Sequence, residues 1–188
     1  LHRMSVRRLQ GEAIRDAILA VSGRLDKKMY GPPVAVHLTT FMEGRGRPGR
    51  SGPLDGEGRR TIYQEVRRNF LSPMMLAFDM PQPLSTFGRR TTSNVPAQSL
   101  IMMNDPFVVE QSKLWAKRVL GMGNDDNQRV NIAYQLAFSR LPDQEETLAA
   151  QTFLVTQAKA HGEAQPGEKA WSDLCHGLFN VKEFIFLH

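Results

Sequence analysis

Cysteine is almost absent from this sequence of 188 residues, and long apolar runs do not occur in it. Cys175 is the single cysteine, so the chain can form no internal disulfide and has no CxxC motif for a metal ion or haem. No stretch approaches the roughly 18 consecutive apolar residues of a membrane-spanning helix. The sequence therefore predicts no membrane span, and we expect Cys175 to be a small buried side chain beside Trp171 and Leu178.

Motifs of several enzyme classes are missing as well. The sequence has no GxSxG motif, and its glycine-rich stretch GRGRPGRSG lacks the GK[ST] ending of a phosphate-binding loop. The histidines do not form a metal-ligand pattern with other ligand residues. We therefore expect no metal site and no bound cofactor in this chain.

Positively charged residues outnumber negatively charged ones. The formal net charge is +5, and 23% of the residues are charged against 41% that are hydrophobic, which is ordinary for a globular protein. Arginine is concentrated in the middle of the chain, where nine arginines lie between Arg45 and Arg90. This surplus permits attraction to an anionic partner but does not require one.

The N-terminal part predicts one amphipathic helix over residues 5–25, which should end near Gly23. Its apolar residues recur every three or four positions, which places Glu12, Arg15 and Asp16 on the opposite face, in water.

The segment between this helix and residue 99 has weaker signals. Residues 34–39 alternate apolar and polar side chains as a strand does. Residues 59–70 fit either a strand or the face of a helix, and we favour a strand that pairs with residues 34–39. Residues 43–58 contain six glycines and two prolines, which predicts a long flexible loop rich in Gly and Arg. Residues 71–99 carry several prolines and a run of methionines, so we expect an irregular segment that wraps the core.

The C-terminal half, residues 96–188, predicts a series of helices. Pro96 and Pro106 suit the first position of two of them, over residues 96–104 and 106–120. Asp143 and Glu146 form the pattern of a capping box that opens a later helix. The expected fold is therefore mainly α, a helical domain with a minor two-stranded β element, and we treat residues 1–188 as a single domain.

Several long runs together resemble one family. The runs SVRRLQGEAIRDAILAVSGRLD, MYGPPV, GRRTIYQEVRRNFLSPMMLAFDMP, GRRTTSNVPAQSLIMMNDPFV and LFNVKEFIFL are similar to the planctomycete PSD domain family, domain of unknown function 1553. The resemblance implies the C-terminal part of an exported, multidomain protein in the periplasm or outside the cell. It brings no established catalytic residues. The chain starts at Leu1 rather than at a methionine, which also fits a piece of a longer protein.

Four arginines are the candidate anion site: Arg59, Arg60, Arg89 and Arg90. Guanidinium groups bind phosphate, sulfate or carboxylate through paired hydrogen bonds. The alternative is that they pair with carboxylates such as Asp79 and hold an irregular segment in place. Nucleic acid is a disfavoured ligand, because no aromatic residues are interleaved with the basic ones.

Asp79, in AFDMP, is the main candidate catalytic acid, since apolar neighbours can raise the pKa of a carboxyl group. Glu65 and Asp105 are further candidates for an acid–base pair, but capping explains Asp105 and Glu65 can pair with Arg67 or Arg68. An aspartate beside several arginines is more often a buried salt-bridge partner. We therefore expect a non-catalytic accessory module that packs on upstream domains of the same polypeptide. The alternatives are part of an enzyme that acts on anionic polysaccharide, and a module that binds carbohydrate or another polyanion.

Overall fold

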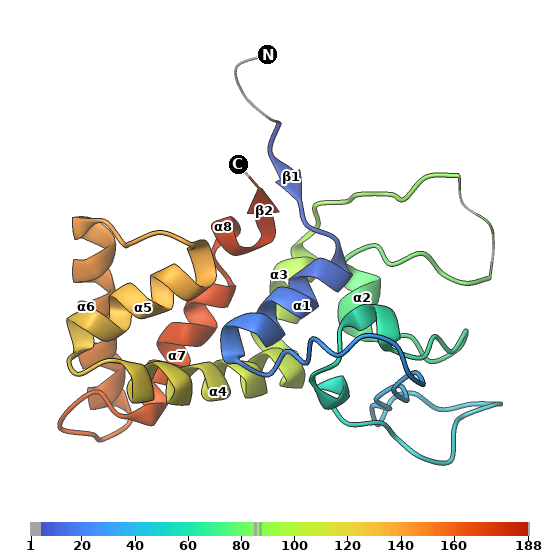
Figure 1. Ribbon diagram of the computed structural model, residues 1–188, viewed down its shortest axis with the longest axis horizontal. Helices are drawn as coiled ribbons and strands as arrows, with labels where there is room; N and C mark the ends of the chain where they lie inside the picture. Colours follow the sequence, from blue (N-terminus) through green and yellow to red (C-terminus); the bar gives the residue numbers. More distant parts are fainter. Residues whose placement is uncertain (1–4, 85, 87, 188) are drawn as a thin grey trace.

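The computed structural model describes residues 5–84, 86 and 88–187, and within this part the protein is mainly helical (Figure 1). Two 3₁₀ helices, Gly56–Gly58 and Thr61–Tyr63, lie in the long connection after the first α-helix. The other elements are, in order, β1 (Arg7–Arg8), α1 (Gly11–Ser22), α2 (Pro73–Ala77), α3 (Pro96–Asn104), α4 (Pro106–Met122), α5 (Asp126–Phe138), α6 (Gln144–Ala160), α7 (Glu168–Phe179), α8 (Lys182–Ile185) and β2 (Phe186–Leu187). The expected mainly α fold with a minor two-stranded element is confirmed.

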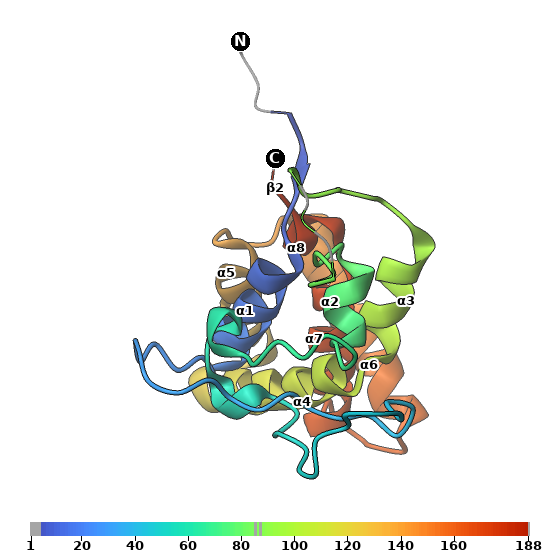
Figure 2. The ribbon, with the colours of Figure 1, turned by 90° about the vertical axis from the view of Figure 1, so that its right-hand side faces the viewer.

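Helix α4 is the helix against which both α1 and α7 pack. It runs along one side of the molecule (Figures 1 and 2). Trp115 of α4 is fully buried and its ring lies 4.7 Å from that of Phe179 on α7. On the α1 side, the hydroxyl of Ser22 donates to the side-chain oxygen of Gln111 at 2.7 Å. The core therefore forms where these three helices meet.

The first helix is shorter than the sequence predicts, and part of the face that was expected in water is buried. Helix α1 begins at Gly11, and it ends as expected at Gly23, which adopts a left-handed conformation with φ of 80°. Arg15, expected in water, is only 4% exposed. The prediction for Arg15 was wrong because the segment 55–61 covers this side of the helix and supplies hydrogen-bond acceptors for the guanidinium group.

The two-stranded sheet joins the ends of the chain. Strand β1 pairs antiparallel with β2, so that Arg8 lies opposite Phe186, and the first and last strands lie side by side (Figure 1). The predicted pairing of strands 34–39 and 59–70 was wrong. Only one isolated bridge, between Val34 and Gln64, connects these segments within the described residues, and a 3₁₀ helix over Thr61–Tyr63 interrupts the second one.

The glycine-rich stretch 43–58 is not uniform. Its first half is irregular and mostly exposed, whereas Gly52, Gly56 and Gly58 are buried. The Gly52 N–H donates to the carbonyl of Val36 at 2.9 Å, which holds the second half in place. Flexibility of the first half stays a prediction.

Between residues 71 and 99 the chain forms one helical turn that the sequence reading missed. Helix α2 starts at Pro73 and buries Met74 and Met75, each 2% exposed, so this segment covers the core as expected. The later helices follow their sequence signals: α3 starts at Pro96, the Asp105 side chain caps α4, and Asp143 with Glu146 forms the capping box of α6. Cys175 is fully buried.

Within the described residues, the helices are too short or too polar to span a membrane.

The packing of Gly52 generates a stability prediction. A Cβ atom at this position would lie 1.9 Å from the carbonyl oxygen of Ala35. Gly52→Ala should therefore lower the free energy of unfolding by about 1–3 kcal/mol, as overpacking does, measured by urea denaturation. Gly49→Ala is the matched control, since a Cβ there would meet no atom within 4 Å. Equal stability of the two variants would contradict the packing of this segment.

Candidate functional site

A pocket of about 690 Å³ lies between α1, α2, the junction of α3 with α4, and the segments 36–39 and 54–66. Its volume is in the range of roughly 300–1,000 Å³ that small-molecule sites occupy. Helices supply one side, while irregular chain supplies the other. The pocket therefore exists only because the irregular segments are held against the helices.

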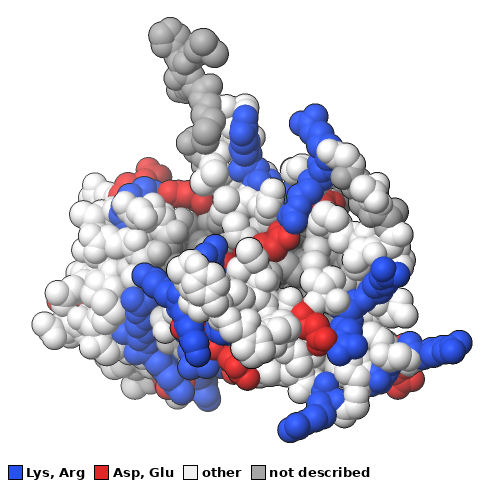
Figure 3. Space-filling model, turned by 45° about the vertical axis from the view of Figure 1, so that its right-hand side comes forward, with Lys and Arg blue, Asp and Glu red and all other residues white. Residues whose placement is uncertain are grey.

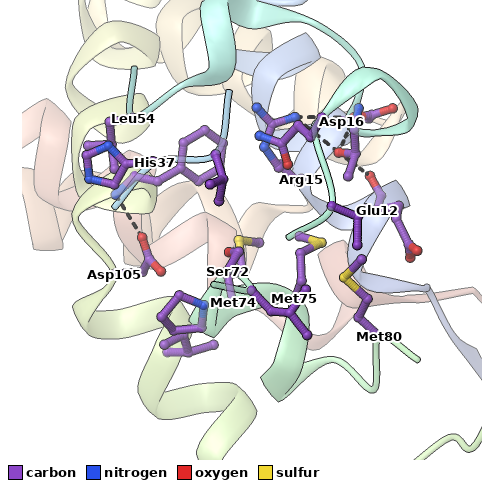
Figure 4. A pocket seen from close by; sticks show the side chains of 18 of the residues that line it. Glu12, Arg15, Asp16, His37, Leu54, Ser72, Met74, Met75, Met80 and Asp105 are labelled. Carbon is purple, nitrogen blue, oxygen red and sulfur yellow. Dashed lines mark hydrogen bonds and ion pairs between the residues drawn. The ribbon is translucent and has the colours of Figure 1, made fainter. Parts of the chain in front are cut away.

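The floor of the pocket is apolar. Met74 and Met75 come from α2, and Met80 follows it, while Phe70 and Phe107 add aromatic surface. Figure 4 shows Met74 and Met75 between two polar ends of the pocket. Thioether side chains are flexible and adapt to ligands of different shape.

One polar end is built around Arg15. Its guanidinium group donates to the backbone carbonyls of Asp55 at 2.7 Å and Arg59 at 3.0 Å, and to the hydroxyl of Thr61 at 3.1 Å. Burial lowers the pKa of Arg15 to about 10, while the nearby carboxylates of Asp16 and Asp55 act in the opposite direction. Arg15 is still a cation at neutral pH, and its donors are used within the protein.

Glu12 and Arg90 form a second pair at this end. Both nitrogens at the tip of Arg90 donate to the carboxylate of Glu12, at 2.8 and 3.0 Å, and one of them also donates to Gln10. These hydrogen bonds hold the pKa of Glu12 below its ordinary value, although partial burial acts the other way. The positive charge of Arg90 is thus balanced by the carboxylate of Glu12, which also lines the pocket.

The opposite end holds Asp105 and His37 (Figure 4). One carboxylate oxygen of Asp105 accepts the N–H of Phe107 at 2.9 Å and so caps α4. Burial raises the pKa of Asp105, and this outweighs the opposite effects of the Phe107 hydrogen bond and of His37. Nδ1 of His37 lies 3.0 Å from the carbonyl oxygen of Gly52, which can only accept, so the neutral ring carries its hydrogen on Nδ1.

Asp79, the predicted catalytic acid, does not line the pocket. Its carboxylate accepts hydrogen bonds from Arg8 at 2.5 Å and from the backbone and hydroxyl of Ser93 at 2.7 and 2.8 Å. Burial alone would raise the pKa of Asp79, but the Ser93 hydrogen bonds and the Arg8 charge hold it below its ordinary value. These contacts make Asp79 a salt-bridge partner that stays ionised.

The four candidate anion-binding arginines do not form one site. Arg59 is 7% exposed, donates to the carbonyl of Tyr30 and lies 4.3 Å from the centre of the Tyr63 ring. Arg60 lies 3.5 Å from the carboxylate of Asp16, and Arg90 is held by Glu12, while Arg89 is exposed outside the pocket. In Figure 3 the basic side chains are spread over the surface with acidic ones between them.

Two of the four candidate arginines, Arg60 and Arg90, line the pocket, but sequence reasoning missed several of its other polar residues. Glu12, Asp16 and His37 carried no motif, and Asp105 was considered as an acid–base candidate but was explained by capping. The one usable signal was the apolar run around Met74 and Met75 in a proline-rich segment, which indicated a covered surface.

No group of three or more His, Cys, Asp or Glu side chains suited to a metal ion occurs among the described residues, and His2 and His188 lie outside them.

A family model described as PSD1, protein of unknown function (DUF1553), matches residues 1–154. The match contains all of the pocket residues and ends inside α6, so the run LFNVKEFIFL lies outside it. No curated protein and no solved structure matches the chain.

The contacts of Asp79 predict a pH-dependent loss of stability. Asp79 has a φ of 61°, which asparagine tolerates, so Asp79→Asn removes the charge and leaves the backbone in place. The side chain of Arg8 is 4% exposed, and leaving its charge unpaired should cost about 3 kcal/mol at pH 7 in urea denaturation. Because the folded pKa of Asp79 is lowered, the difference from the native protein should shrink as the pH falls below about 4.

The matched control for this prediction is Asp173→Asn, which removes an exposed partner of His161 and should cost less than about 1 kcal/mol. If Asp79→Asn were as stable as the native protein at pH 7, the ion pair would have no structural role.

Proposed function

We propose that this chain, which belongs to the PSD1 family of proteins of unknown function (DUF1553), is a non-catalytic accessory module that packs on other domains of a larger polypeptide. The resemblance to a family whose members carry this domain at the C-terminus supports that place in the protein. It also supports an exported protein, in the periplasm or outside the cell, whose upstream domains are the partner.

The observation that carries this proposal is a set of large apolar side chains exposed on the segment 29–66. Phe41 is 94% exposed, Ile62 76% and Tyr30 75%, and Met29 and Val66 are more than half exposed. The backbone N–H of Tyr30 donates to the Tyr63 hydroxyl, which places residues 29–30 beside residues 62–63. Phe41 and Val66 belong to the same stretch of chain. Exposed apolar side chains of this size are typical of sites where proteins meet. We call these five residues the docking surface.

The contacts of the candidate acid favour an accessory role over catalysis. An acid–base group must gain and lose a proton near the working pH. Asp79 is held ionised by Arg8 and Ser93, and its pKa is lowered although burial acts in the opposite direction. An ion pair of this kind suits a framework whose task is to present a surface.

A second set of exposed apolar side chains lies on α6. Leu148 and Val155 are both exposed there, and the family match, which ends at residue 154, includes Leu148 but not Val155. Helix α6 lies on the side of the molecule away from the segment 29–66 (Figure 1).

The proposal predicts that a polar substitution on the docking surface weakens domain association. Ile62→Ser should reduce the affinity of this chain for the remainder of its polypeptide, expressed separately, by at least about tenfold in calorimetric titration. The reason is that a large side chain would leave water on binding.

Leu148→Ser is the matched control, because Leu148 is a similar side chain that is 65% exposed on α6. An unchanged affinity for Ile62→Ser, a loss confined to Leu148→Ser, or a gene that encodes no further domain would each overturn the proposal.

A further inference from the structure

We propose that the pocket binds an organic cation, whose ammonium group pairs with Asp105 while its apolar body lies on the methionine floor. This inference goes beyond the docking role and can be tested with small molecules, and it involves a neighbouring part of the molecule, because Ile62 and Val66 of the docking surface also line the pocket.

The charge balance of the pocket is the first step. Four carboxylates and three guanidinium groups line it. Arg90 pairs with Glu12, Arg60 and Arg15 lie within 4 Å of Asp16, and Glu65 is paired with Arg67. These contacts use the basic groups on carboxylates of the protein. An anionic ligand would have to displace them, so the pocket is poorly suited to anions.

Asp105 is the exception among the four carboxylates. Within the described part of the chain, its carboxylate forms no ion pair with Lys or Arg, and the only hydrogen bond of this carboxylate is the one from the Phe107 N–H. That bond occupies one oxygen, because an N-cap requires a single acceptor. The second oxygen is left for a ligand. A partly buried carboxylate without an Arg or Lys partner is costly, and a cation that enters beside it reduces that cost.

His37 adds a second acceptor at the same end. Because its Nδ1 hydrogen is directed to the carbonyl of Gly52, the neutral ring presents Nε2 as an acceptor. A primary ammonium group has three N–H donors, which can reach a carboxylate oxygen and an imidazole nitrogen together. The carboxylate of Asp105 and the neutral form of the His37 ring therefore offer two acceptors at this end of the pocket.

The floor selects the rest of the ligand. Met74 and Met75 are almost fully buried and Met80 partly so, and they separate the Asp105 end from the Glu12 end (Figure 4). An alkyl chain of several carbons would cover this apolar surface once its ammonium group lies at Asp105. The same chemistry occurs in a free alkylamine and in a lysine side chain of a polypeptide, and the test must separate these two sources.

The test uses hexylammonium, with hexanol and hexanoate as probes of the same chain length but different charge. Binding is followed by NMR of the methionine methyl groups. Hexylammonium should shift the signals of Met74, Met75 and Met80, and should bind at least about tenfold more tightly than hexanol. Met29 and Met122, which are exposed and outside the pocket, serve as internal controls.

Asp105→Asn should reduce the preference for hexylammonium over hexanol to less than about twofold, because asparagine keeps the helix cap but has no charge. Asp105→Ser, which also caps, provides a second variant should the first one fold poorly. Asp125→Asn is the matched control: Asp125 caps α5 in the same way through the N–H of Gln128, outside the pocket, and the preference should stay unchanged.

A second pair of probes identifies the source of the cation. The capped tripeptide Leu-Lys-Leu is compared with Leu-norleucine-Leu, which lacks only the ammonium group. Tighter binding of the lysine peptide than of hexylammonium, lost on replacement by norleucine, supports a polypeptide ligand. Tighter binding of hexylammonium supports a free amine.

The proposal is overturned if hexanol or hexanoate binds as tightly as hexylammonium. It is also overturned if Asp105→Asn keeps the full preference, or if the shifted signals belong only to Met29 and Met122.

Discussion

The buried guanidinium group of Arg15 is the contact on which the N-terminal half of the molecule depends. The segment 55–63 contains only two short 3₁₀ helices, so few of its backbone N–H and carbonyl groups form hydrogen bonds within regular secondary structure. Arg15 supplies donors to two carbonyls and one hydroxyl of this segment from a single position on α1. Asp16, the next residue, accepts hydrogen bonds from the N–H and the hydroxyl of Thr61. Two adjacent side chains of α1 therefore bind this segment, one to its carbonyl groups and one to an N–H group. Gly56 is required there, because a Cβ atom would lie 2.6 Å from the Arg15 guanidinium.

Contacts of the same kind hold two further arginine side chains inside the protein. Arg8, Arg15 and Arg59 are all buried, and each donates to a carbonyl or carboxylate of the protein itself. A chain with long irregular segments has many backbone carbonyl groups without a hydrogen-bond partner in a helix or sheet. These carbonyl oxygens accept hydrogen bonds from arginine in place of an anionic ligand. An arginine bound to such carbonyls and one bound to a phosphate look the same in a sequence, since composition records the charge and not its partner.

The parts that the sequence predicted are those with local causes. Helices α3 to α7 follow from apolar periodicity and from caps within a few residues, such as Pro96 or the pair Asp143 and Glu146. The pairing of β1 with β2 joins the two ends of the chain, so no local pattern reveals it. The burial of Arg15 also has a distant cause, because the segment that covers it lies 40 or more residues further along the chain. The helical periodicity of apolar residues places Arg15 on the solvent face. It contains no information about a distant segment that packs over that face.

Asp105 illustrates how a correct local explanation can hide a tertiary role. An aspartate before a proline at the start of a helix is fully accounted for as a cap, and the structure contains that cap. Capping engages one oxygen and leaves the net charge of the carboxylate in place. On an exposed helix water would solvate that charge, but here segments 36–39 and 54–66 close a pocket over it and burial raises its pKa. The sequence specifies the cap through neighbouring residues, whereas the partial burial of Asp105 depends on distant segments, one of which contains the residues that Arg15 holds in place. The environment of this carboxylate is therefore set by tertiary contacts that no local pattern reveals.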